Sequence, residues 1–367
     1  MKYFIVSGEA SGDLHGSNLV KEIMAMDTQA EIQCWGGDLM QSAGATVLKH
    51  YRELAFMGFA EVLMNLRTIL KNLNLCKRQI QAFKPDVVVL IDYPGFNLRI
   101  ARFAFEAGFR VDYYISPQIW AWKQSRVEII KQYVHRMMVI LPFEQPFYEQ
   151  LGYPVDFVGH PLLDAISNNQ YVFDKGSDTR PIIALLPGSR RQEIYAMLPL
   201  MVATVSKFPK YRFMIAAAPS VPVEWYHSHI GNSNIELVFG NTYGLLSVAT
   251  AALVTSGTAT LETALFRVPQ VVCYKGNVIS YHIARKLIKV KFISLVNLIM
   301  DREVVKELIQ GELNPGNLEH HLRLLTENTP QRAQVLNDYD QLRISLGGSG
   351  ASKRAASHIV ADAVGDQ

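Results

Sequence analysis

Two series of short apolar runs, separated by longer segments of helical periodicity, constrain the fold of this chain more than any other feature. Such alternation predicts a parallel sheet with helices on both of its faces. The expected strands of the first series are 3–7, 32–35, 87–91, 111–115, 137–141 and 155–158, with helices at 16–26, 59–83 and 98–107. The expected strands of the second series are 182–186, 213–217, 235–239, 251–255 and 270–274.

A polar, turn-rich stretch at 167–178 separates the two series and is typical of a linker. A length of 367 residues also suggests two domains. We therefore expect two Rossmann-like, doubly wound α/β domains, at 1–170 and 171–345, followed by a helical tail at 346–367. Two such domains would face a cleft at the carboxyl ends of their strands.

Composition excludes several classes of protein. Lys and Arg number 36 against 33 Asp and Glu, whereas a dedicated nucleic-acid-binding protein would be strongly basic. No apolar run reaches the roughly 18 residues of a membrane span, and the polar residues Ser7 and Glu9 interrupt the N-terminal run too early for a signal peptide. The three cysteines lack metal-site spacing and indicate reduced thiols in a cytoplasmic protein.

The first apolar run leads into a loop of sequence SGEASGD, which raises the question of phosphate binding. The loop has neither the Gly-Lys-Ser/Thr ending of a Walker motif nor the G-x-G-x-x-G spacing of a dinucleotide site. Its candidate ligand-binding residues are Gly8, Glu9, Ser11, Gly12 and Asp13. The alternative is a turn that needs glycine torsions, with Ser11 or Asp13 capping the next helix.

In the stretch PIIALLPGSRRQEI (181–194), an apolar strand ends at Pro187-Gly188. We expect Ser189 to open a helix, with Gln192 at the capping-box position. Free backbone N–H groups at a helix start form an anion site. Arg190 is unusual there, because cations are disfavoured at a helix N-terminus, unless an anion docks beside it. A plain surface arginine is the alternative.

A second strand-to-helix loop, Ser256-Gly257-Thr258, follows in AALVTSGTATLETAL (251–265). Glu262 lies one turn into the expected helix, where a carboxylate can accept both hydroxyls of a ribose. It could instead be an acid that complements the helix dipole. Two anion-binding loops in the same half favour a site for a nucleotide diphosphate.

Asp92 directly follows the apolar run 87–91, at the position where open α/β sheets bind ligands. A carboxylate there is a candidate general base. The alternative is a turn-forming aspartate ahead of Tyr93-Pro94-Gly95. Trp120 and Trp122 fit either core packing or a substrate platform, and the sequence does not separate these two readings.

Taken in order, these motifs resemble the lipid-A-disaccharide synthases, a glycosyltransferase family with the GT-B fold. The resemblance runs from the first strand to about residue 345. The matching pieces are SGEASGD (7–13), MG (57–58) with EVL (61–63), KPD (84–86), ID (91–92), YISP (114–117), WAW (120–122), LPFE (141–144), LLPGSR (185–190), SGTA (256–259), LE (261–262), SL (294–295) and NL (297–298).

The resemblance implies an inverting, metal-independent transfer without a cofactor. UDP-2,3-diacylglucosamine would donate its sugar to 2,3-diacylglucosamine 1-phosphate, giving UDP and a β-1,6-linked disaccharide. Asp92 matches the family's base, and the SGEASGD loop lies on the acceptor side. The UDP-binding residues implied are Gly188, Ser189, Arg190, Ser256, Gly257, Thr258, Ala259, Glu262 and Asn297. Three positions depart from the family: Gly95 replaces a second acid, Lys123 stands where arginine is common, and Pro161 follows His160 where some members have threonine.

Two other functions remain open from the sequence. Another UDP-sugar enzyme of the GT-B fold, such as an epimerase or a transferase with a soluble acceptor, would share the loops of the second half. A membrane-associated nucleotide-sugar-binding protein would bind without turnover. Appearance of both UDP and a disaccharide would separate them.

Acylated substrates imply a peripheral protein on the cytosolic face of a Gram-negative inner membrane, and the resemblance allows a homodimer. Segment 57–80 has apolar residues at helical spacing, and we expect Met57, Phe59 and Met64 to line an acyl groove. Basic residues add attraction to anionic lipid; they are Lys71, Lys77 and Arg78, with a second set at Arg285, Lys286, Lys289 and Lys291. The alternative is two ordinary amphipathic helices packed on their sheets.

Overall fold

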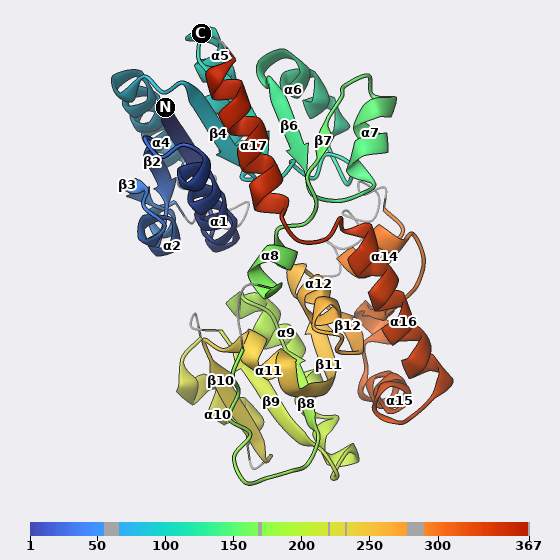
Figure 1. Cartoon of the computed structure of the whole chain (residues 1–367). Coiled ribbons are helices and arrows are strands. Elements are labelled where there is room, and N and C mark those ends of the chain that lie inside the picture. The colour runs from blue at the N-terminus through green and yellow to red at the C-terminus, as the bar shows by residue number, and fades with distance from the viewer. Residues whose placement is uncertain (55–65, 168–170, 219–220, 232, 277–289, 366–367) are drawn as a thin grey trace. The chain divides into compact units, whose positions relative to one another are not determined.

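Two parallel sheets organise the chain, one in each of the two units into which it divides (Figure 1). The computed structural model describes residues 1–54, 66–167, 171–218, 221–231, 233–276 and 290–365. The first unit comprises Met1–Asn168 and Leu346–Gln367, and the second comprises Asn169–Ser345. The predicted parallel α/β class is confirmed for both units.

The described part of the first unit holds a sheet of seven strands in the order β3-β2-β1-β4-β5-β6-β7. The strands are β1 (Lys2–Ser7), β2 (Glu31–Gly36), β3 (Thr46–His50), β4 (Val87–Ile91), β5 (Arg110–Tyr114), β6 (Arg136–Val139) and β7 (Asp156–Phe157). All pairings are parallel. The central strand β4 is completely buried, as its uninterrupted apolar sequence VVVLI predicts.

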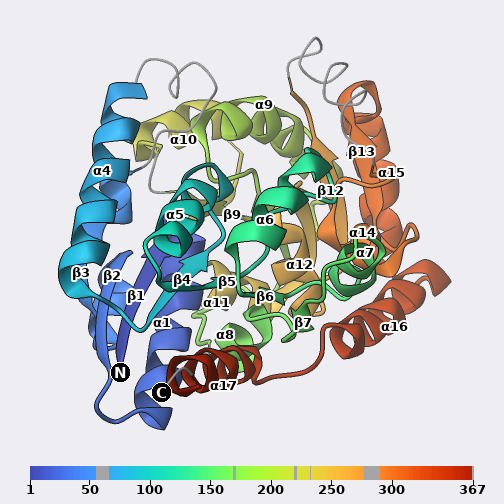
Figure 2. The same ribbon diagram turned by 90° about the horizontal axis from the view of Figure 1, so that it is seen from above.

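Helices cover both faces of this sheet. They are α1 (Ala10–Met26), α2 (Asp38–Ser42), α4 (Leu66–Phe83), α5 (Pro94–Glu106), α6 (Val127–Tyr133), α7 (Glu144–Gln150), α8 (Leu162–Ser167) and α17 (Ala351–Val364), with short 3₁₀ turns η1 (Tyr51–Glu53) and η2 (Gln124–Arg126). Figures 1 and 2 show α4, α5 and α6 side by side on one face, whereas α1 and α17 lie on the other.

The glycine-rich segment after β1 is mostly helix, since α1 begins at Ala10 and not near residue 16. Its glycines allow close packing. A Cβ on Gly8 would lie 2.5 Å from the Tyr93 ring, and one on Gly12 would lie 2.8 Å from Cβ of Ser7. Sequence reasoning took these glycines for a loop, because glycine usually weakens a helix.

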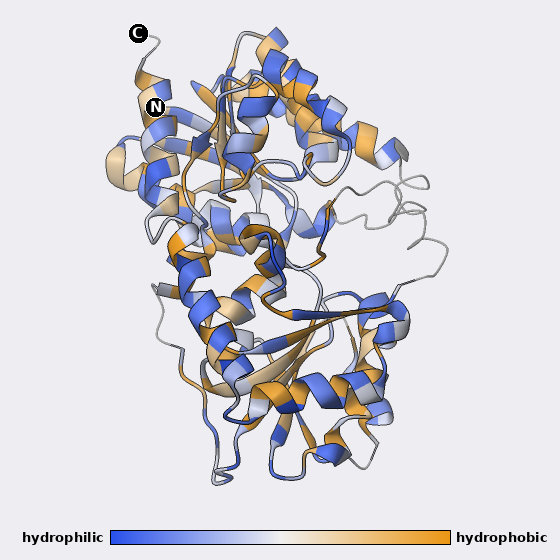
Figure 3. Cartoon of the chain, turned by 90° about the vertical axis from the view of Figure 1, so that its right-hand side faces the viewer, coloured by the Kyte–Doolittle hydropathy of each residue, from blue (hydrophilic) through white to orange (hydrophobic). Residues whose placement is uncertain are grey.

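The second unit has the same architecture. Its described residues form a sheet of six parallel strands in the order β10-β9-β8-β11-β12-β13. Its strands are β8 (Ile182–Leu186), β9 (Arg212–Ala217), β10 (Ile235–Phe239), β11 (Ala249–Thr255), β12 (Gln270–Tyr274) and β13 (Lys306–Ile309). Its helices are α9 (Arg191–Val202), α10 (Val223–Ile230), α11 (Thr242–Val248), α12 (Thr258–Leu265), α14 (Leu295–Met300), α15 (Pro315–Thr326) and α16 (Pro330–Ser345), with turns η3 (Val205–Lys207) and η4 (Gln310–Glu312). Helices of both units show polar and apolar residues along their length (Figure 3), as expected where one side packs on a sheet.

The C-terminal helix α17 belongs to the first unit, where it packs on α1 and on strands β4 and β5. An ion-pair network fastens its end. Asp362 accepts from Arg136 Nε at 2.5 Å and pairs with Arg110 at 3.1 Å, and its side chain is only 7% exposed. Beneath it, burial and then the Asp362 charge raise the pKa of Asp112 well above its ordinary value. The segment expected to be a tail is thus anchored by buried charge.

This network gives a test of how α17 is held. Asp362→Asn removes a buried carboxylate that pairs with both Arg110 and Arg136, so we expect a loss of up to about 3 kcal/mol in the free energy of unfolding. The matched control is Asp156→Asn. Asp156 pairs with the same Arg136 at 2.7 Å but is 38% exposed, so its loss should cost no more than about 1 kcal/mol.

The measurement is urea unfolding followed by tryptophan fluorescence, since three of the four tryptophans, Trp35, Trp120 and Trp122, lie in the first unit. Equal effects of the two substitutions would contradict the anchoring role of Asp362.

Candidate functional site

The strand order of the first unit reverses between β1 and β4, where the chain leaves the sheet in opposite directions. Ligands of open α/β sheets bind at such switch points, beyond the carboxyl ends of the strands. Ser7 of β1 pairs with Ile91 of β4, so Glu9 and Asp92 follow adjacent strand ends. The structure therefore brings together two acids that are distant in the sequence.

The backbone around Asp92 is held in an uncommon conformation. Asp92 and Tyr93 have φ angles of +45° and +48°, a left-handed region that non-glycine residues rarely adopt. The Asp92 N–H donates to the carbonyl of Tyr114 at 3.2 Å. Its own carbonyl accepts from Asn97 Nδ2 at 2.8 Å and from the hydroxyl of Tyr113. Strained residues cluster at functional sites. This geometry therefore favours a functional role for Asp92 over that of a turn-forming aspartate.

Burial raises the pKa of Asp92 to about 6, and the negative charge of Glu9 adds to this rise. A hydrogen bond from the Tyr93 backbone acts in the opposite direction. A carboxylate with a pKa near the working pH suits general-base catalysis, because it accepts a proton more readily than an ordinary aspartate.

The other residues of the SGEASGD loop divide into two groups. Asp13 is buried, and its two oxygens accept from the backbone N–H groups of Gly37, Leu39 and Met40 at 2.8–3.1 Å. It therefore caps α2, and Gly8 and Gly12 serve close packing. Ser11 is exposed and Glu9 is half-buried, so these two side chains are the ones accessible to a ligand.

The strand order of the second unit reverses between β8 and β11. Leu186 pairs with Val254, so the loops at Gly188 and at Gly257 follow neighbouring strand ends. Both predicted anion loops thus lie at one switch point. Each leads into a helix N-terminus, where partial positive charge collects.

The first of these loops differs in detail from the prediction. Helix α9 begins at Arg191, with Arg190 at the N-cap, and the capping acid is Glu193 instead of Gln192. The Glu193 carboxylate accepts from the backbone N–H groups of Ser189 and Arg190 at 3.2 and 3.3 Å, and pairs with the Arg190 guanidinium at 3.4 Å. An internal carboxylate therefore occupies groups that could bind a phosphate.

The second loop is open. Gly257 caps α12 with φ +152°, and a Cβ there would meet nothing within 4 Å. Thr258 is exposed and Ala259 is half-buried. Further along α12, Glu262 Oε1 accepts from the hydroxyl of Tyr243 at 2.7 Å. Burial raises the pKa of Glu262, while the Tyr243 bond counteracts this rise.

Two expected UDP-binding side chains are engaged elsewhere. The Ser256 hydroxyl donates to the Ile293 carbonyl at 2.8 Å. Asn297 is fully buried, and its amide donates to Glu307 and the Val305 carbonyl at 2.9 Å while its oxygen accepts from the Val304 and Val305 N–H groups. These bonds hold both side chains within the second unit.

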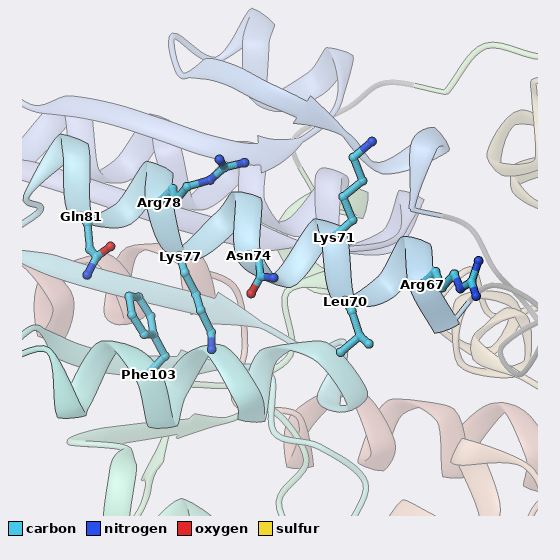
Figure 4. A pocket seen from close by; sticks show the side chains of 8 residues that line it. All are labelled: Arg67, Leu70, Lys71, Asn74, Lys77, Arg78, Gln81 and Phe103. Atoms are coloured by element: carbon cyan, nitrogen blue, oxygen red, sulfur yellow. The ribbon is translucent and has the colours of Figure 1, made fainter.

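A basic groove of about 740 Å³ lies along helices α4 and α5 of the first unit (Figure 4). It is lined by Arg67, Leu70, Lys71, Asn74, Lys77, Arg78, Gln81 and Phe103. Lys77 and Leu70 point to the α5 side of α4, whereas Lys71 and Arg78 point to the opposite side. On the inward side, Leu73, Cys76 and Ile80 join the core.

Several membrane predictions lie outside the described residues, namely those for Met57, Phe59, Met64, Arg285, Lys286 and Lys289. Lys291 is described, and it forms an exposed pair with Asp301 at 3.0 Å. None of the described helices is long and apolar enough to cross a bilayer. Within the same residues, no group of three or more His, Cys, Asp or Glu side chains is placed to hold a metal ion.

Sequence reasoning missed three side chains that shape these sites. Tyr113 and Tyr243 bond to the candidate residues Asp92 and Glu262, but both lie about 20 positions away in the chain. Glu193 follows Arg190 at capping-box spacing, so the motif SRRQE carried a usable signal for it.

Comparison with known proteins identifies the family. The lipid-A-disaccharide synthetase family matches residues 3–361. The chain is 40% identical to a lipid-A-disaccharide synthase of Syntrophus aciditrophicus, covering 96% of this chain and 95% of that one. It is 37% identical to the enzyme of Geobacter metallireducens, with 98% and 96% covered.

Solved structures support the fold at low sequence identity. The glycotransferase of kitacinnamycin superimposes with a TM-score of 0.70 at 13% identity, covering 98% of each chain. A UDP-GlcNAc 2-epimerase of Neisseria meningitidis, bound to UDP-GlcNAc, gives 0.69 at 13% identity over 98% of this chain and 100% of that one. The predicted GT-B fold and the resemblance are both confirmed, and the chain belongs to the lipid-A-disaccharide synthase family, the glycosyltransferases that form the disaccharide of lipid A.

Proposed function

We propose that Asp92 is the general base of this synthase. It would remove the proton from the 6-hydroxyl of 2,3-diacylglucosamine 1-phosphate, and that oxygen would attack the anomeric carbon of UDP-2,3-diacylglucosamine from the face opposite UDP. The observation that carries this assignment is the position of Asp92 at the switch point of the first sheet, with its pKa raised to about 6 by burial and by Glu9. Glu9 and Ser11 would orient the acceptor.

We assign the leaving UDP to the second unit. Negative charge grows on the diphosphate as the glycosidic bond breaks, and preorganised N–H groups and cations stabilise such charge most strongly in the transition state. Arg190 and the N-termini of α9 and α12 supply these groups, and Glu262 would accept the ribose hydroxyls. Glu193 would have to release Arg190 and the backbone N–H groups when the diphosphate binds, because two anions cannot share them.

The overall activity has a direct test. Incubation of the purified chain with UDP-2,3-diacylglucosamine and 2,3-diacylglucosamine 1-phosphate should yield both UDP and a disaccharide. UDP without a disaccharide would indicate hydrolysis only, and absence of both products would overturn the proposal.

Asp92→Asn keeps the shape of the side chain but removes its basicity, so we expect kcat to fall by about 10²–10⁴ with UDP binding unchanged. In the wild type, activity should rise with pH through about 6 as Asp92 loses its proton. Near-normal turnover of Asp92→Asn would remove it as the base.

Glu9→Gln tests the electrostatic part of this assignment. Loss of the Glu9 charge removes one cause of the raised Asp92 pKa, so the acidic limb of the kcat/KM profile should move to lower pH. The control is Glu22→Gln, which removes the same charge further along α1 and should leave the limb in place. A limb that stays fixed in Glu9→Gln would contradict the coupling.

Arg190→Ala and Glu193→Gln should act in opposite directions on UDP affinity. Loss of the cation removes a charge-assisted contact worth about 1.5–3 kcal/mol, or 10- to 100-fold in Kd. Glu193→Gln removes the competing anion, so UDP should bind more tightly. Calorimetric titration with UDP measures both, with Arg180→Ala as a control, because that exposed arginine already pairs with Asp178. Unchanged UDP affinity in Arg190→Ala would support a plain surface arginine.

We also propose that the enzyme works on the cytosolic surface of the inner membrane, from which it takes its acylated substrates. The basic groove on α4 supports this, since the eight residues that line it include four cations and no acid. Such a surface is attracted to anionic lipid by about 1 kcal/mol per basic residue.

Changing Arg67, Lys71, Lys77 and Arg78 together to Ser should therefore release the protein from vesicles that contain anionic lipid. Sedimentation measures the bound fraction, which should also fall with ionic strength. The control changes four exposed basic residues of the second unit, Lys175, Arg180, Lys207 and Lys210. Equal losses in both variants would indicate general charge attraction instead of a defined membrane face.

A further inference from the structure

The loop between β5 and η2, residues 115–123, is held in an uncommon conformation beside the candidate base. It begins at Ile115 with φ +66° and ends at Lys123 with φ +56°. A β-branched residue in the left-handed region is a true outlier. Such strain persists only where the surroundings hold it, and it concentrates at functional sites.

Helix α7 supplies the contacts that hold this loop. The fully buried Glu144 accepts from Trp120 Nε1 at 3.2 Å, and its other oxygen accepts from the Leu141 N–H at 2.9 Å. The Ser116 hydroxyl bonds the hydroxyl of Tyr148 at 2.7 Å. Trp120 is thus a fixed part of the loop, and its side chain is partly buried.

Trp122, in contrast, is exposed to solvent, and two cations lie against its ring. Its side chain is 47% exposed. Nζ of Lys123 lies 4.6 Å from the ring centroid, and Cζ of Arg126 lies 5.3 Å from it, distances typical of cation–π contacts. The nearby ion pairs of the described residues, Lys131–Glu128 and Arg136–Asp156, involve neither cation. Both cations thus contact the same indole ring, which carries no charge of its own and leaves their positive charge in place.

This cation pair lies on the same edge of the sheet as Asp92. Strands β4 and β5 are neighbours, with Ile91 paired to Tyr114. The Tyr113 hydroxyl donates to the Asp92 carbonyl. Burial raises the pKa of Tyr113 most, the Asp92 charge raises it further, and the Arg126 charge lowers it, so both charges act on the same phenol.

The chemistry of the acceptor calls for such a site. The acceptor carries a phosphate on carbon 1 and reacts through its 6-hydroxyl, at opposite ends of one sugar ring. The diphosphate of the donor is assigned to the second unit, where Arg190 would bind it. The phosphate of the acceptor therefore needs other cations. We propose that Lys123 and Arg126 bind the 1-phosphate of the acceptor while Asp92 receives the proton of its 6-hydroxyl. This assignment rests on the proposed function and names the groups that would select a phosphorylated acceptor.

The test compares two acceptors, the diacylglucosamine 1-phosphate and the same acylated sugar with a free 1-hydroxyl. The wild type should use the phosphorylated acceptor with the lower KM. Lys123→Gln and Arg126→Gln should each raise that KM by about 10- to 100-fold, as expected for loss of a charge-assisted contact. The KM for the UDP donor, and the rate with the hydroxyl analogue, should stay unchanged.

The control is Lys131→Gln on α6, which removes a nearby charge already paired with Glu128 at 3.4 Å, and it should keep the wild-type preference. Lys123→Arg should also keep it, because the charge remains. Equal loss of rate with both acceptors would show a merely structural role and overturn the inference, as would an undiminished preference in both glutamine variants. A wild type that forms no disaccharide would refute the proposed function itself.

Discussion

Parallel pairing of β1 with β4, and of β8 with β11, is the constraint on which both candidate sites depend. At each pair the chain continues to opposite sides of the sheet, and such points are where open α/β sheets bind ligands. The groups that meet there come from distant parts of the sequence. Glu9 and Asp92 meet in this way, and so do the loops at Gly188 and Gly257.

The two units share this topology, but the charge at the switch point is negative in the first unit and positive in the second. In the first, two acids lie together near a strand end, and burial raises the pKa of Asp92 to about 6. In the second, helix N-termini and Arg190 provide positive charge, which an internal carboxylate, Glu193, partly neutralises. The fold is the same in both units, and the side chains at the two switch points give them different charge.

Most strands could be predicted because buried parallel strands are continuous apolar runs, as VVVLI at β4 shows. The edge strands β3 (TVLKH) and β13 (KELI) were missed, since polar residues interrupt their apolar pattern. The start of α1 was missed because its glycines meet specific neighbours, and such contacts are not visible in a sequence. For the same reason the bonds of Asp13 to the backbone of Gly37, Leu39 and Met40 could not be predicted from the sequence.

Backbone strain shows where the first unit has been shaped for more than stability. Of the eight non-glycine residues with positive φ among those described, four lie in the two loops that follow β4 and β5: Asp92, Tyr93, Ile115 and Lys123. Each such conformation costs on the order of 1–3 kcal/mol, and the bonds made by Asn97, Tyr113 and Glu144 offset that cost. A fold selected for stability alone would gain by relaxing these loops. Their retention is understandable if the strained form presents Asp92 on one loop and the cations around Trp122 on the next.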